Sequence, residues 1–152
     1  MDFRLILAIL LSIAPFSELR GGIPYGLANG YDPILVIVIC IIANILIVFP
    51  LFFFLDYVHK YLNRIKIYHK IFNKVLVRAR RKIEGKVGSS WEFVALFFVV
   101  AIPFPGTGAY TGTLASWAFK LDRKKSLLAI SLGVVAAGII TSLVSLGILS
   151  LF

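Results

Sequence analysis

Two long stretches of this 152-residue chain contain no Asp, Glu, Lys or Arg: residues 33–55 and residues 126–152. As α-helices they would extend about 35 Å and about 40 Å, whereas the hydrocarbon core of a bilayer is roughly 30 Å thick. Only 15% of the residues are charged and 60% are hydrophobic, against about a quarter charged in soluble domains. The sequence therefore predicts an all-α integral membrane protein, with one membrane domain over residues 1–152.

The positive charge lies in one segment. The chain carries a net charge of +9, and residues 60–86 hold ten of its Lys and Arg side chains. Apolar residues recur there at helical spacing, so we expect a basic amphipathic helix over residues 57–86 that lies on the membrane surface. Such a cluster beside apolar spans favours anionic lipid head groups over nucleic acid as its partner. We expect membrane lipids, and no nucleic acid, among the partners.

Two further apolar stretches, residues 3–16 and 93–103, are too short to cross a bilayer as helices, at roughly 16–21 Å. Each runs into helix-breaking residues, "SELRGGIP" over 17–24 and "PFPGTG" over 103–108. Small residues then recur at every fourth position, which lets helices approach closely in a membrane. These residues are Gly22, Gly26 and Gly30 in the first half, and Gly108, Gly112 and Ser116 in the second.

The distribution of cations predicts the topology. Residues 57–90 and 120–125 are expected in the cytoplasm because Lys and Arg favour that side of the membrane. Residues 91–119 must then enter the membrane and return, as a re-entrant hairpin. The same reasoning makes residues 1–31 a re-entrant hairpin from the opposite face. The chain reads as two inverted repeats, each a hairpin followed by a transmembrane helix, in a multi-pass plasma-membrane protein. Four short membrane segments enclose a substrate path poorly, so we expect a homodimer.

The two hairpin tips are the candidate site. Non-helical backbone in a bilayer must find partners inside the protein, so we expect the tips to meet. Helix N-termini and the Arg20 guanidinium would bind a phosphate or carboxylate. Glu18 has two readings: a carboxylate that couples binding to protonation, or one half of a structural ion pair with Arg20. The candidate substrate-binding residues are Glu18, Arg20, Gly21, Gly22, Pro24, Pro103, Pro105, Gly106, Thr107, Gly108 and Tyr110.

Other chemistry is not indicated. His59 and His69 lie in the basic helix without neighbouring Asp, Glu or Cys, so we expect no metal site and no cofactor. No nucleophile and base are paired, and we do not expect an enzyme. Asp32 and Asp122 each precede an apolar run, and we expect them to cap the helices that follow.

The motifs "SELRGGIPYGLANG", "AIPFPGTGAYTGTLAS" and "AISLGVVAAGIITS" resemble those of the small multi-drug export protein family. This resemblance covers nearly the whole chain except the cytoplasmic helix, and it implies export of small molecules. More distantly, the chain resembles DedA/VTT-type membrane proteins, which have opposed re-entrant hairpins and are implicated in moving polyprenyl phosphate or phospholipid. By position, Glu18 and Arg20 match the charged pair of their first hairpin. The second hairpin departs from that pattern, because residues 104–119 contain neither an acid nor an arginine.

The sequence thus predicts a small proton-coupled transporter that moves an anionic or amphipathic substrate through a site between two re-entrant tips. One alternative is a DedA-like translocase of lipid phosphate, such as polyprenyl phosphate or a phospholipid. A second alternative is a membrane scaffold that transports nothing.

Overall fold

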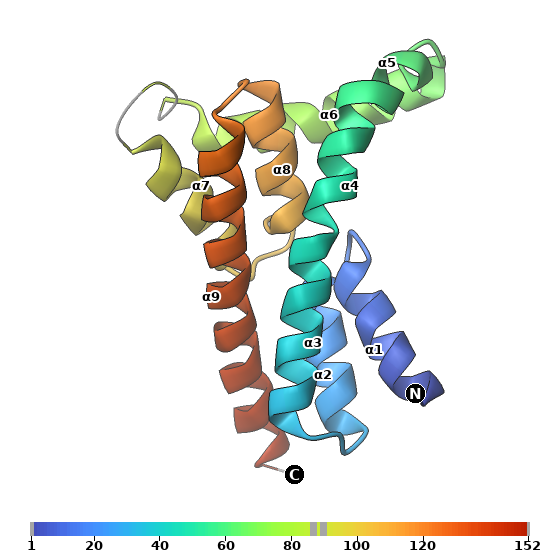
Figure 1. The fold of residues 1–152 in the computed structure, drawn as a ribbon, viewed down its shortest axis with the longest axis vertical. Helices are drawn as coiled ribbons and strands as arrows, with labels where there is room; N and C mark the ends of the chain where they lie inside the picture. Colours follow the sequence, from blue (N-terminus) through green and yellow to red (C-terminus); the bar gives the residue numbers. More distant parts are fainter. Residues whose placement is uncertain (1, 86–87, 89–90, 152) are drawn as a thin grey trace.

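Two long antiparallel helical rods run the length of the molecule (Figure 1). The computed structural model describes residues 2–85, 88 and 91–151. The first rod joins α3 (Pro33–Leu46), α4 (Val48–Phe53), the π-helical turn η1 (Phe54–Val58) and α5 (His59–Leu62). The second rod is α9 (Arg123–Leu149). By length and composition, both Pro33–Leu62 and Arg123–Leu149 can cross a membrane.

The outward faces of these rods are apolar. Ile34, Val38 and Ile42 of α3 are exposed, as are Leu128, Ile139 and Leu143 of α9. A soluble protein rarely exposes such large apolar surfaces, and lipid is the solvent that suits them. The first rod also extends past the predicted end at residue 55, and its regular hydrogen bonding is interrupted just before Pro50, which has no N–H to donate.

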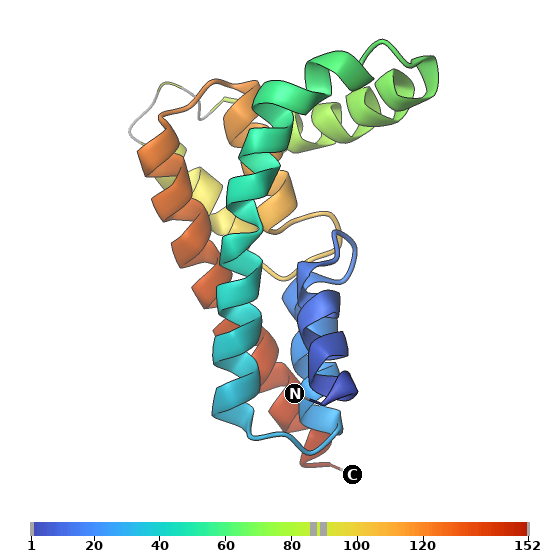
Figure 2. The same cartoon turned by 45° about the vertical axis from the view of Figure 1, so that its right-hand side comes forward.

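A pair of short helices packs at each end of the rods (Figures 1 and 2). The first pair is α1 (Phe3–Ile13) and α2 (Glu18–Ala28), and the second is α7 (Glu92–Ala101) and α8 (Ala109–Ala118). Each pair turns back near the middle of the molecule, and the two turns point toward each other from opposite ends. The all-α prediction is confirmed for the described residues, while re-entrance and an inverted repeat stay predictions.

The basic segment is not the single helix predicted over residues 57–86. Residues 57 and 58 belong to η1, and α5 ends at Leu62 before α6 (Lys66–Ile83) begins. Between them, Ile65 takes an extended conformation and the His69 ring bonds the Asn63 side chain at 2.7 Å. The chain reverses there, and α6 packs on α8 through the buried Ala79. Residues 86, 87, 89 and 90 of the predicted cytoplasmic segment lie outside the described residues.

Glycines set the close approach of the short helices. A Cβ at Gly22 would lie 2.5 Å from the Ala8 carbonyl oxygen of α1, and one at Gly26 would lie 2.6 Å from a Val36 methyl of α3. In the second pair, a Cβ at Gly112 would lie 2.5 Å from a Val100 methyl of α7. These small residues therefore pack helices within one chain.

The predicted helix caps are confirmed at both long helices. The Asp32 carboxylate accepts a hydrogen bond of 2.9 Å from the Leu35 N–H at the start of α3. The Asp122 carboxylate accepts one of 2.9 Å from the Lys125 N–H at the start of α9. Each carboxylate satisfies an N–H that the helix itself leaves unpaired and fixes where its rod begins.

Candidate functional site between the helix turns

The two turns meet at the carboxylate of Glu18. Glu18 is the first residue of α2 and is 7% exposed. Its Oε1 accepts a hydrogen bond of 3.5 Å from the Tyr110 N–H of α8. The Ala109 N–H lies beside the same carboxylate. Glu18 thus lies at the N-terminus of α8, where free N–H groups and the helix dipole stabilise negative charge. The sequence analysis expected a substrate anion at this helix N-terminus. In the structure, the carboxylate of Glu18 lies there instead.

Strained backbone holds this contact. Glu18 has a φ of 47°, a left-handed conformation that costs energy for any residue with a side chain. Opposite it, Gly108 has a φ of 125°, and a Cβ there would overlap the Glu18 carboxylate. Gly106 also needs its positive φ of 81°. Both glycines are therefore required by the geometry of the second turn.

Two side chains order the turns. The Tyr110 hydroxyl donates a hydrogen bond to the Ile13 carbonyl, so one residue of α8 contacts both sides of the first turn. In the second turn, the Thr107 hydroxyl lies 2.6 Å from the carbonyl oxygens of Ile102 and Phe104. These contacts give hydrogen-bond partners to carbonyl groups at the helix ends and in the second turn.

Arg20 lies beside Glu18 without pairing with it. Among the described residues the ion pair within 4.0 Å is Arg123–Asp56, and no hydrogen bond or ion pair there engages the Arg20 guanidinium. The reading of Glu18 and Arg20 as a structural ion pair is therefore not supported by the geometry. Arg20 instead lines three neighbouring cavities.

The largest of these, the wide cavity, has a volume of about 830 Å³ and extends from the first turn to α6. It is lined mostly by apolar side chains, including Leu51 of α4 and Phe72 of α6. The second, the distal cavity, has a volume of about 410 Å³ and lies toward the far ends of α2 and α9, at Ala28 and Leu149. The third, the central cavity, is a small space of about 10 Å³ between the turns.

The structure brings most of the predicted site residues together. The wide cavity is lined by Glu18, Arg20, Gly21, Pro105, Gly106, Thr107 and Tyr110. Pro103 and Gly108 line the central cavity, and Pro24 lines the distal cavity. Gly22 has a different role, since it packs against α1.

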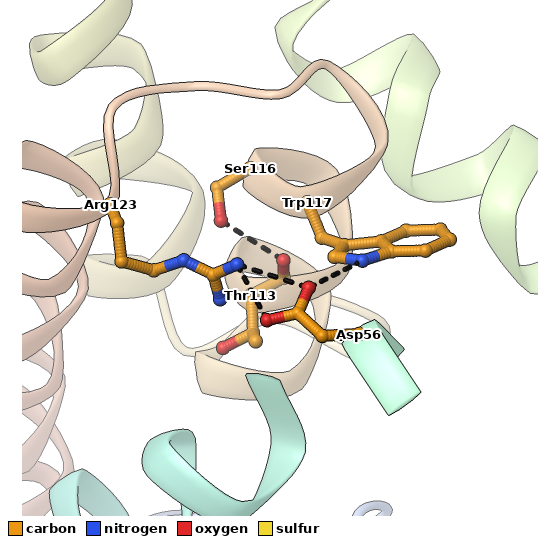
Figure 3. Close-up of polar contacts among 5 residues, drawn as sticks. All are labelled: Asp56, Thr113, Ser116, Trp117 and Arg123. Carbon is orange, nitrogen blue, oxygen red and sulfur yellow. Dashed lines mark hydrogen bonds and ion pairs between the residues drawn. The ribbon is translucent and has the colours of Figure 1, made fainter. Parts of the chain in front are cut away.

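A second polar cluster was missed by sequence reasoning (Figure 3). Asp56 in η1 accepts a hydrogen bond of 3.1 Å from the Trp117 indole N–H of α8 and forms an ion pair of 2.9 Å with Arg123 at the start of α9. The Arg123 guanidinium also stacks 3.9 Å from the Phe52 ring centre. Beside them, the Ser116 hydroxyl donates to the Thr113 carbonyl at 3.0 Å.

This cluster joins the first rod, the second helix pair and the second rod at one end of the molecule. One signal could have revealed it: Asp56 is the only acid between residues 33 and 83. A π-helical turn, which often marks functional positions, carries it toward its partners.

The comparisons with known proteins agree with the motifs. The family described as "Putative small multi-drug export protein" matches residues 18–140, a range that begins at Glu18, directly after the first turn, and contains the first rod, the second turn, the Asp56 cluster and α9 as far as Ile140. No curated protein and no solved structure matches the chain. The family and the two long apolar helices indicate a membrane protein with a role in export rather than catalysis. The chain belongs to the small multi-drug export protein family.

Proposed function

We propose that this protein carries a small anionic or amphipathic molecule across the membrane, past Arg20. The observation that carries the proposal is the position of this guanidinium. It lines both the wide and the distal cavity, which extend toward opposite ends of the molecule, and it has no hydrogen-bond partner among the described residues. Placing a half-buried cation in a membrane costs free energy, and binding an anion reduces that cost.

The wide cavity suits the apolar part of such a substrate. Its volume of about 830 Å³ lies within the usual range for small-molecule sites, and apolar side chains dominate its lining. Arg78 of α6 adds a second cation at the side away from the turns. The substrate would place its anionic group on Arg20 and its apolar body against Leu51, Phe54 and Phe72.

Glu18 is the residue that we propose couples transport to protons. When ionised, it lowers the positive potential at Arg20 and weakens anion binding, because the two side chains are near neighbours in a low dielectric. When protonated, it leaves the full charge of Arg20 for the substrate. Small movements of the turns about Gly106 and Gly108 would then open the wide and the distal cavity in alternation.

The proposed topology places both turns near the middle of the plasma membrane as re-entrant hairpins, with residues 57–90 and 120–125 in the cytoplasm. In this topology the wide cavity lies on the cytoplasmic side, beneath α6, and the distal cavity on the other side. We propose a homodimer, because four short helices and two rods cover a transport path incompletely.

Transport by purified protein in proteoliposomes tests the function. A polyprenyl phosphate and a cationic amphipathic dye would be compared, with and without a pH gradient. Arg20→Gln and Glu18→Gln are the test variants. Arg4→Gln, which removes an exposed guanidinium on α1, is the matched control.

We expect Arg20→Gln to lose anion transport and the control to retain it. Glu18→Gln should keep anion binding, because glutamine mimics the protonated carboxyl, but its transport should no longer respond to the pH gradient. Movement of the phosphate lipid would identify a DedA-like translocase, for which the large apolar cavity is suited. Dye movement that depends on Glu18 but not on Arg20 would overturn the anion site. If the native protein moves neither compound, and both variants fold stably, the result would favour a scaffold.

A further inference from the structure

We propose that a cavity at the end of α8 binds the phosphate of an anionic phospholipid through Arg80 and Lys120. This cavity, which we call the basic cavity, has a volume of about 610 Å³. Among the described residues, it shares no lining residue with the wide, distal or central cavity. The proposal therefore concerns a site outside the transport path and does not rest on the proposed function.

The basic cavity lies where four parts of the chain meet. The first rod contributes Asp56, α6 contributes Arg80, the turn after α8 contributes Lys120, and α9 contributes Arg123. Three of these four charged side chains are cations. The volume is within the usual range for a site that binds a small molecule or a head group.

The acid of this lining is already compensated. Asp56 forms the ion pair of 2.9 Å with Arg123 and accepts the hydrogen bond of 3.1 Å from the Trp117 indole N–H (Figure 3). No ion pair among the described residues engages Arg80 or Lys120. These two side chains leave the described lining positively charged, which favours an anionic ligand.

Neighbouring negative charge does not cancel these two cations. Asp122 is not among the described residues that line the cavity, and its carboxylate caps α9 by accepting from the Lys125 N–H at 2.9 Å. The carbonyl end of α8 borders the cavity at Ala118, whereas the first turns of α9 border it at Ser126. The two helix dipoles therefore oppose each other, and the side chains decide the charge.

Local contacts hold both cations at the end of α8. Arg80 Nη2 donates a hydrogen bond of 3.4 Å to the carbonyl of Ala118, two residues before Lys120. The Arg80 guanidinium also lies 5.6 Å from the centre of the Phe119 ring. Lys120 has a φ of 54°, a left-handed conformation in which glycine is usual at a helix end. The other N–H groups of Arg80 and the Lys120 ammonium can bind phosphate oxygens.

The surroundings favour a lipid over a soluble anion. The first rod exposes Phe49 and Phe53, on either side of Phe52, which lines the basic cavity. Helix α9 exposes Leu128 in its second turn. Trp117, with its apolar ring and polar N–H, is typical of the membrane–water interface. A phospholipid can place its phosphate on the cations and its tails along the rods, as in other basic cavities between membrane helices.

Quenching of Trp117 fluorescence by brominated phosphatidylglycerol tests the site. The protein contains two tryptophans, so Trp91→Phe leaves Trp117 as the only one. The full-length protein would be reconstituted in phosphatidylcholine vesicles, with brominated tails on either a phosphatidylglycerol or a phosphatidylcholine fraction. We expect phosphatidylglycerol to reach half-maximal quenching at a roughly 10- to 25-fold lower mole fraction, because each unpaired cation strengthens binding of an anionic lipid about fivefold.

Lys120→Asn and Arg80→Gln test the two cations separately. Asparagine tolerates a left-handed backbone, so the first variant removes the charge and keeps the turn. Each substitution should raise the half-quenching fraction of phosphatidylglycerol about fivefold. The matched control combines Lys74→Gln with Arg81→Gln, which removes two cations of α6 outside the described lining and should leave the fraction unchanged. Arg20→Gln, in the transport path, should leave it unchanged as well.

Equal losses in the test variants and the control would show that diffuse surface charge attracts the lipid, and would overturn the site. A loss in Arg20→Gln alone would place the lipid in the transport path and overturn it too. Displacement of the brominated lipid by millimolar inorganic phosphate would identify a soluble anion as the ligand and overturn the lipid assignment. Losses confined to Lys120→Asn and Arg80→Gln would support the site, and because quenching requires no transport, this result is independent of the proposed function.

Discussion

Substituting Gly22 by alanine separates a packing role from a substrate-binding role at this residue. The Cβ of an alanine would lie 2.5 Å from the Ala8 carbonyl oxygen, 2.6 Å from the Ser12 Cβ and 2.9 Å from the Ser12 backbone nitrogen. Two of these three atoms belong to the backbone of α1, and Ala8 and Ser12 are both fully buried. The clash cannot be relieved by rotating a flexible side chain, so α1 and α2 must move apart.

The expected cost follows from the two opposing effects of the added methyl group. Overpacking a close contact costs about 1–3 kcal/mol. The higher helix propensity of alanine offsets this by at most about 1 kcal/mol. A net loss of about 1–2 kcal/mol should lower Tm by roughly 2–8 °C for a chain of this size.

Thermal unfolding in detergent or nanodiscs, followed by intrinsic fluorescence, measures this loss. Gly147→Ala is the matched control: it lies in α9, and a Cβ there would meet nothing within 4 Å. Alanine should leave Tm unchanged at that position or raise it slightly. If Gly22→Ala were as stable as Gly147→Ala, the close approach of α1 and α2 described above would be wrong.

Two further substitutions probe the contacts that join the elements. Tyr110→Phe removes the hydroxyl that bonds the Ile13 carbonyl and should destabilise the protein by about 0.5–1.5 kcal/mol. Its Tm should fall, whereas Tyr25→Phe, for which no hydroxyl contact to the described residues is found, should match the native protein. Asp56→Asn removes the ion pair with Arg123, whose partners are 42% and 36% exposed, so solvent screening limits the loss to about 1 kcal/mol or less. Trp117 fluorescence should nevertheless shift, because the indole N–H of this residue bonds the altered side chain at 3.1 Å; an unchanged spectrum would argue against that contact.

The local elements follow closely from the sequence. Charge-free runs predicted both rods, and Asp32 and Asp122 predicted where each begins. The break at residues 103–108 was predicted because glycine and proline end helices. The first break was predicted too late in the chain: the turn lies at residues 14–17, and "SELRGGIP" is helical from Glu18 onward, with Pro24 inside α2. The basic segment was predicted less well. Its apolar spacing continues through residues 63–65, and only the contact of α6 with α8 explains the reversal there.

The candidate site was predicted in part. Glu18, Arg20 and the residues of the second turn stand out because charges and helix breaks are rare in apolar surroundings. Asp56 lies 61 residues from Trp117 and 67 from Arg123, so no local pattern connects them.

The sequence by itself determined that this protein suits a membrane, where its two long helices lie and where the chain breaks between α7 and α8. Those properties depend on hydropathy, capping and backbone preference, which act over a few neighbouring residues. The tertiary structure decided which groups share a cavity. It placed Glu18 on the N-terminus of α8 and left Arg20 unpaired between two cavities. These outcomes depend on how closely the helices pack, which in turn rests on side-chain volumes at Gly22, Gly26 and Gly112.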